Sequence, residues 1–186
     1  MKVQDGFGTL NTFCTYCQIF ECPKTENTAL NGRAEQKNTT NERNASLVVD
    51  GKDETYGHTE WRGPGQLRVT WWLVEISQKE CIRKINIRFK ADSEDRKKIP
   101  GFSLYISDLK PNGDEYRGSH CYTYTTTDLS GVPGTKFSFT NCTRQGKFVI
   151  LYNKRDQTMP ESDKKIYSKY PHLQLNEVEV YVDKGA

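Results

Sequence analysis

Lys84-Ile85-Asn86-Ile87-Arg88-Phe89-Lys90 is the stretch of this chain that most clearly decides its fold. Apolar side chains at Ile85, Ile87 and Phe89 alternate strictly with polar ones, and this period of two predicts a strand with one face in a core and the other in solvent. The same alternation returns in Gly101-Phe102-Ser103-Leu104-Tyr105-Ile106-Ser107. Both segments therefore predict a β-protein whose strands bury one face each.

Further strand-like segments lie on both sides of this stretch. Trp71-Trp72-Leu73-Val74-Glu75-Ile76 precedes it, with its tryptophans expected in the core, and Val178-Glu179-Val180-Tyr181-Val182 closes the chain. Phe148-Val149-Ile150-Leu151-Tyr152 is continuously apolar, which is typical of a central strand. Turn signals such as Asn31-Gly32 and Asp50-Gly51 separate the strands, and no long amphipathic helix is apparent. The regular spacing predicts an all-β jelly-roll β-sandwich.

Composition agrees with one such domain and excludes several other classes. The chain has 186 residues, of which 34% are hydrophobic and 27% charged, a balance that suits strands with a single apolar face. Basic residues number 27 and acidic residues 24, so the charge gives no dedicated surface for nucleic acid. No segment approaches the roughly 20 apolar residues of a membrane span, so no membrane insertion within this chain is expected.

Cysteines and glycosylation sequons indicate an oxidising, extracellular environment. The six cysteines form an even set, and N-glycosylation acceptors are predicted at Asn38, Asn44 and Asn141. We therefore expect a secreted chain or a cell-surface ectodomain. Met1-Lys2-Val3-Gln4-Asp5-Gly6 has no apolar signal segment, so the interpretation is a mature or excised chain with an initiator Met.

The sequence divides at residue 25. Residues 1–25 form a Cys-rich leader, and residues 26–186 carry the strand pattern. Cys14-Thr15-Tyr16-Cys17 is not followed by a helix pattern, and no second cysteine pair lies nearby to complete a zinc site, so a disulfide-stapled leader is favoured over redox or zinc chemistry. The pairing of four cysteines stays open at this point: Cys14, Cys17, Cys22 and Cys81.

Catalytic motifs are missing from the sequence. The three histidines are scattered, and there is no nucleophile elbow, His-Glu-x-x-His motif or phosphate loop. Asp53 and Glu60 form an imaginable glycosidase pair, but nothing in the sequence places them across a bond. We therefore expect a binding protein and no enzyme.

Five segments in order along the chain resemble the fucolectin (F-type lectin) and discoidin-like branch of the galactose-binding β-sandwiches. They are Ala29–Gly32, Val48–Gly51, Gly101–Ser107, Gly146–Asn153 and Asn176–Tyr181. The chain is similar to fucolectin-like modules of invertebrate cell-surface receptor ectodomains. This resemblance implies extracellular ligand recognition, with a glycan as the leading ligand class. A protein-binding adhesion or receptor module that has lost the sugar site is the alternative, and an architectural spacer is a third.

The resemblance also implies a structural calcium ion. Its expected ligands are the side chains of Asp50 and Glu177 and the carbonyls of Leu47 and Asn176. Calcium takes six to eight oxygen ligands from carboxylates and carbonyls, so an acid-rich turn beside an acidic last strand suits it. The plainer interpretation of Asp50 is a side chain that caps its own turn.

The ligand site implied by the resemblance lies at one loop end of the sandwich. Its expected residues combine a histidine, arginine donors, an orienting carboxylate and an aromatic face: His58, Trp61, Arg88, Asp92 and Arg96. Lys90 stands where the fucolectin pattern has an acidic residue, and the interval between His58 and Arg88 is longer than in that pattern. We therefore expect fucose itself to bind weakly or not at all, and an acidic or differently substituted glycan to suit the site better.

The family's disulfide pattern is kept in one place and lost in another. Cys121 and Cys142 match a disulfide of the family, and we expect them to be bonded and all six cysteines to be oxidised. Asn176 stands where the family usually has a cysteine, and that cysteine's usual partner near His58 is missing as well. The loss of both halves is self-consistent and leaves the expected metal site less tightly stapled.

Overall fold

The computed structural model describes residues 26–60, 68–90, 98–112, 118–124, 135–155, 168 and 170–183. In this part of the chain the elements are a single 3-10 helix, η2, and eight strands: β1 (Arg33–Gln36), η2 (Ala45–Val48), β2 (Gly57–Glu60), β3 (Arg68–Phe89), β4 (Phe102–Ser107), β5 (Ser119–Thr123), β6 (Lys136–Phe139), β7 (Arg144–Arg155) and β8 (His172–Asp183). The predicted all-β sandwich is confirmed. The predicted leader, residues 1–25, lies outside the described residues.

Strand β3 is the element around which the sandwich is built. Its first half pairs with β1 on one side and β7 on the other, and its second half pairs with β8 and β6. A register shift between Glu75 and Glu80 marks the bend between the halves. The sequence predicts two separate strands here, over 71–76 and 85–89, and the structure instead has one strand of 22 residues.

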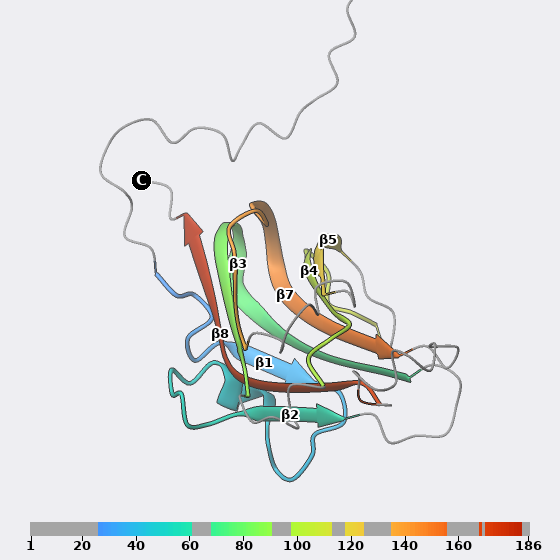
Figure 1. The fold of residues 1–186 in the computed structure, drawn as a ribbon. Coiled ribbons are helices and arrows are strands. Elements are labelled where there is room, and N and C mark those ends of the chain that lie inside the picture. The colour runs from blue at the N-terminus through green and yellow to red at the C-terminus, as the bar shows by residue number, and fades with distance from the viewer. Residues whose placement is uncertain are drawn as a thin grey trace, which may run out of the picture.

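The remaining strands extend the two halves of β3 into two layers. The path β2-β8-β3-β7-β4-β5 runs from one edge to the other. Figure 1 shows β3 and β7 curving side by side through the middle, with β8 on one side and β4 and β5 on the other. Strand β8 is antiparallel to both β2 and β3, so it places side chains from all three strands next to one another.

The core lies between the layers and follows the predicted alternation. Ile85, Ile87 and Phe89 are at most 2% exposed, whereas the polar residues between them are half-buried. Trp72 is fully buried and its indole N–H donates to the Ala45 carbonyl at 3.1 Å. Strand β7 is apolar on both faces, because its other face joins a second cluster around Ile150. The prediction of a central strand at this position is therefore confirmed.

The disulfide between Cys121 and Cys142 is present, with the two Cα atoms 5.4 Å apart. It ties β5 to the turn that precedes β7. Cys81 is disulfide-bonded too, whereas Cys14, Cys17 and Cys22 lie outside the described residues. In the described ranges no helix is long and apolar enough to cross a membrane.

Candidate functional site

The loop between η2 and β2 gathers oxygen atoms around one hydroxyl. Thr55 Oγ1 lies 3.3 Å from the Leu47 carbonyl, 2.9 Å from each carboxylate oxygen of Asp50 and 3.1 Å from the Lys52 carbonyl. A hydroxyl has only one proton to donate. Since one donor cannot satisfy four acceptors at once, this oxygen-rich centre is better suited to a cation than to the hydroxyl alone.

Asp50 also accepts a hydrogen bond from the backbone N–H of Lys52, at 3.0 Å. This is the bond of an aspartate that caps its own turn, so the plainer interpretation of Asp50 holds in the structure. This hydrogen bond uses one lone pair of one Asp50 carboxylate oxygen. The carboxylate has further lone pairs, so turn capping and metal binding are compatible at this residue.

The side chain of Asn176 fastens this loop to β8. Its amide group donates to the carbonyls of Asp53 at 3.0 Å and Thr55 at 2.9 Å. Arg88 adds a second fastening from β3, because its guanidinium forms an ion pair with Asp53. Asn176 was expected to contribute only its carbonyl, so the role of its side chain is a feature that the sequence does not indicate.

Glu177 is a buried carboxylate beside the same loop. It is only 4% exposed, and neither of its carboxylate oxygens has a hydrogen-bond partner of normal geometry. Burial, followed by the charge of Asp50, raises the pKa of Glu177 to about 7, and the Gly51 amide and Arg88 offset only part of this rise. A carboxylate in such a position is costly to leave unsatisfied, so Glu177 fits a metal ligand.

The donor set of this loop suits calcium and no softer metal. The described residues hold no group of three or more His, Cys, Asp and Glu side chains that could bind a metal ion. The oxygens present are instead two carboxylates, at Asp50 and Glu177, together with nearby backbone carbonyls. Calcium accepts this mixture of carboxylate and carbonyl oxygens in an irregular loop, whereas zinc prefers nitrogen and sulfur ligands.

His58 lies in a separate polar cluster on β2 and β8. Its ring stacks on that of His172 with 5.9 Å between centroids, and its Nδ1 lies 3.5 Å from the amide nitrogen of Gln174. Lys98 reaches the same glutamine from the loop before β4, donating to its amide oxygen at 3.3 Å. We call His58, His172, Gln174 and Lys98 the edge cluster.

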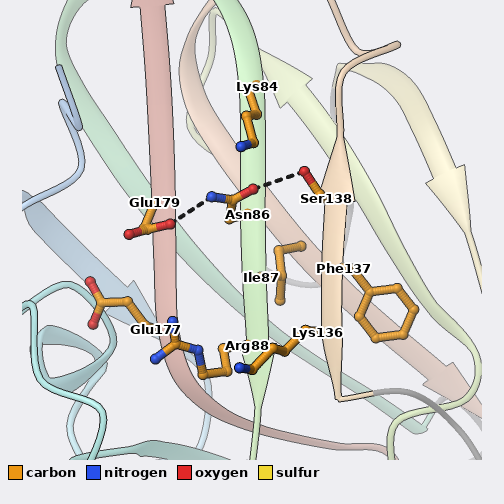
Figure 2. Close-up of a pocket in the computed structure, with 9 residues that line it drawn as sticks. All are labelled: Lys84, Asn86, Ile87, Arg88, Lys136, Phe137, Ser138, Glu177 and Glu179. Atoms are coloured by element: carbon orange, nitrogen blue, oxygen red, sulfur yellow. Dashed lines mark hydrogen bonds between the residues drawn. The ribbon is translucent and has the colours of Figure 1, made fainter. Parts of the chain in front are cut away.

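Arg88 belongs to a different part of the surface. His58 pairs with β8 at Gln174, on one side of that strand, and Arg88 pairs with it at Glu177, on the other side. Figure 2 shows the Arg88 guanidinium next to Glu177, on the face shared with Lys136. The structure thus brings Arg88 to the loop that carries Asp50 and Asp53. Trp61, Asp92 and Arg96 lie outside the described residues, so their predicted part in the ligand site stays a prediction.

The sequence matches no family model, and no curated protein matches it significantly. Solved structures do resemble it. The lectin domain of lectinolysin complexed with Lewis b antigen superposes with a TM-score of 0.63, covering 87% of this chain and 99% of that chain at 17% identity. A Streptococcus pneumoniae fucose binding module reaches 0.60, covering 86% and 96% at 18% identity. The fucolectin from serum of Morone saxatilis, the striped bass, reaches 0.62, covering 87% and 48% at 23% identity.

The chain has the galactose-binding-like fold of these lectin modules. The resemblance inferred from its sequence segments is therefore confirmed for the fold. A chitosan-binding module from Paenibacillus has the same likeness, with a TM-score of 0.59 at 20% identity. The galactose-binding-like fold thus accommodates different saccharides, and ligand and metal must be inferred from the residues of this chain.

Three members of the edge cluster are not indicated by the sequence. Lys98 lies in a run of basic residues, His172 is one of three scattered histidines, and Gln174 carries no motif. They meet because β8 pairs with β2 and because the segment before β4 passes the same edge of the galactose-binding-like fold. His172 and Gln174 alternate along β8 with the core residues Leu173 and Leu175, so they lie on the other face of the strand. This alternation is the feature of the sequence that could have indicated them.

Proposed function

We propose that this chain is an extracellular recognition module that binds a glycan at the edge cluster and is stabilised by a calcium ion in the loop of Asp50 and Glu177. The observation that carries the glycan proposal is the edge cluster itself. His58, His172 and Gln174 are each at most 8% exposed, so a ligand would reach their donors and acceptors, and that of Lys98, at the margin of the cluster. Such a set of polar groups suits a ligand rich in hydroxyl groups. The lectin modules named above, which bind Lewis b or fucose, support the ligand class.

An extracellular location has support from two features of the chain. A disulfide links Cys121 and Cys142, and disulfides persist in oxidising compartments. The three asparagines of the sequons, Asn38, Asn44 and Asn141, are all exposed, as acceptors of glycosylation must be. We propose no catalytic role, since the sequence carries no catalytic motif and the similar structures are binding modules.

Calcium is proposed from the chemistry of the loop. The side chains of Asp50 and Glu177 would hold the ion together with carbonyls such as those of Leu47 and Lys52, which already surround the Thr55 hydroxyl. The carbonyl of Asn176 completes the predicted set. The ion would supply the positive charge that the buried Glu177 carboxylate lacks. It would also fix the loop that leads into β2, and hence the position of His58.

The glycan proposal predicts that His58→Ala weakens binding. A glycan array with the wild-type chain, run with calcium and with a chelator, identifies the ligand, and titration of the strongest hit should show at least a ~10-fold loss in the variant, equivalent to about 1.4 kcal/mol. His120→Ala is the matched control, because His120 is exposed on β5, far from β2 in the strand order. Equal affinity of wild type and His58→Ala would place the site elsewhere. Binding of no glycan by the wild type would instead favour a protein partner.

The calcium proposal predicts a specific effect of Asn176→Ala. The substitution keeps the backbone carbonyl but removes the two hydrogen bonds to Asp53 and Thr55, each worth about 1 kcal/mol. The loop then has to be ordered on binding, so we expect calcium affinity measured by titration calorimetry to fall ~10-fold. Asn112→Ala, at an exposed asparagine, should leave affinity unchanged. If Asn176→Ala binds calcium like the wild type, the side chain does not position the loop.

A further inference from the structure

A groove crosses the solvent-facing side of strands β8, β3 and β6. It has a volume of about 270 Å³ and is lined by Lys84, Asn86, Ile87, Arg88, Lys136, Phe137, Ser138, Glu177 and Glu179. Figure 2 shows that the residues of β3 lie along its centre, with those of β8 on one side and those of β6 on the other. It is thus separate from the edge cluster, which lies where β8 meets β2.

The floor of the groove is fixed by a chain of hydrogen bonds across the three strands. Ser138 Oγ donates to the side-chain oxygen of Asn86 at 2.9 Å, and the Asn86 amide group donates to Glu179 at 2.6 Å (Figure 2). Asn86 thereby uses both ends of its side chain within the protein. This bond holds the Glu179 carboxylate against β3.

The arginine of the groove is engaged outside it, and the other carboxylate points away from its two lysines. Arg88 forms its ion pair with Asp53, in the loop between η2 and β2. Figure 2 shows the Glu177 carboxylate pointing away from Lys136 and Lys84. The Glu179 carboxylate is therefore bonded to the floor of the groove, and the Glu177 carboxylate lies at its margin on the β8 side.

Two ammonium groups remain to face a ligand. Lys136 is exposed, and its ammonium group forms no hydrogen bond or ion pair within the described ranges. Lys84 has its ammonium 5.7 Å from the centre of the Tyr181 ring, a weak cation–π contact that leaves its donors open to solvent. The pair presents positive charge at two places around a floor of amide and hydroxyl groups, which is complementary to an acidic and hydroxyl-rich ligand.

We propose that this groove binds a negatively charged saccharide, with acidic groups held by Lys84 near one end and by Lys136 near the other. The volume is just below the ~300–1,000 Å³ of sites for drug-sized ligands, which suits a short segment of a longer saccharide chain. The ligand class rests on the proposed function, but the site is new and independent of the edge cluster. A neutral glycan would then bind at the edge cluster and an acidic one in the groove.

The experiment measures binding of two acidic probes by titration at low and at physiological salt. A heparin-derived oligosaccharide carries sulfates and carboxylates, and a hyaluronan-derived one carries carboxylates alone, so their comparison identifies the group recognised. The test protein is the double variant Lys84→Gln/Lys136→Gln. The matched control is Lys79→Gln/Lys154→Gln, which changes net charge equally at exposed lysines outside the groove: Lys79 at the bend of β3, where it pairs with Asp108, and Lys154 on β7. We expect the groove variant to lose at least ~10-fold in affinity and the control to stay within ~2-fold.

Three results would overturn the proposal. The first is that the wild type binds neither acidic probe. The second is an equal loss in both double variants, which would indicate a general electrostatic attraction. The third is a loss in His58→Ala with none in the groove variant, which would assign acidic glycans to the edge cluster. The third result leaves the proposed function intact, and failure of a neutral glycan to bind leaves the groove intact, so the two proposals fail separately.

Discussion

Replacing Glu177 with glutamine is expected to abolish the stabilisation that calcium gives to the folded chain. A ligand that binds only the folded state stabilises it by about 2.7 kcal/mol at a hundredfold excess over Kd. The wild type should therefore melt at a clearly higher temperature in calcium than in chelator. Glu177→Gln and Asp50→Ala should each remove that difference, because each deletes one of the two carboxylates of the loop.

The effect of Glu177→Gln on stability differs between chelator and calcium, which makes the test sharper. Burial raises the pKa of Glu177 from 4.5 to about 7, so the charged side chain costs the folded state up to about 3 kcal/mol above pH 7. Glutamine carries no charge. The variant is therefore expected to melt higher than the wild type in chelator at about pH 8, and calcium should largely remove that advantage because it stabilises only the wild type.

The pH dependence follows from the same group. The folded state holds a proton on Glu177 between about pH 4.5 and 7, where the unfolded chain has released it. In chelator, its contribution to stability therefore falls as the pH rises through that interval. Calcium requires the deprotonated carboxylate, so the melting difference between calcium and chelator should be larger at about pH 8 than at about pH 6. Glu54→Gln, in the same loop but exposed, is the control, and a difference unchanged in Glu177→Gln would contradict the site.

Replacing Arg155 with methionine is expected to destabilise the fold by about 3 kcal/mol or more. The side chain is 2% exposed, and its guanidinium donates to the carbonyls of Ser168 at 3.2 Å and Lys98 at 3.4 Å and to the side chain of Asn153. Methionine fills much of the same volume but satisfies none of these acceptors. Each buried acceptor left without a partner costs about 1–3 kcal/mol.

Denaturant unfolding of Arg155→Met measures this loss, and the neighbouring Lys154→Met provides the control. Lys154 is exposed, and its substitution should stay within about 0.5 kcal/mol. Because Arg155 and Asn153 both contact the Lys98 carbonyl, the variant should also disturb the edge cluster. A stability equal to that of the wild type would mean that the guanidinium contacts contribute nothing net.

Local sequence patterns predict most of the fold. The alternation in residues 84–90 and 101–107 places the correct side chains in the core, because a strand that buries one face imposes a period of two. The same reasoning wrongly predicts two strands where the structure has the single strand β3. Ser77-Gln78-Lys79-Glu80 is polar and has the composition of a turn, but in the structure it is a bulge that carries the strand from one layer to the other. Hydrophobic periodicity does not distinguish these two outcomes.

The candidate site is predicted less completely, because its contacts join distant parts of the chain. Asp50 and Glu177 are suggested by their acidic motifs and their resemblance to the fucolectin pattern. The clamp formed by Asn176 and the approach of Lys98 to Gln174 depend on strand pairing across 121 and 76 positions, respectively. Propensity and alternation act over a few residues, so they do not specify such pairs. The groove likewise exists only because β6 and β8 lie on either side of β3.

The shared strand β3 also determines how the domain opens. Strand β7 pairs with the first half of β3 and with Glu80–Ile82, and β8 pairs with the second half from Cys81 onward. Neither layer can therefore separate without breaking hydrogen bonds of the strand they share. The two layers then form one cooperative unit in amide hydrogen exchange, with the protection of β3 set by global unfolding. A ligand on the β8 side would slow exchange in β7 and β4 as well, at a distance from any atom that it contacts.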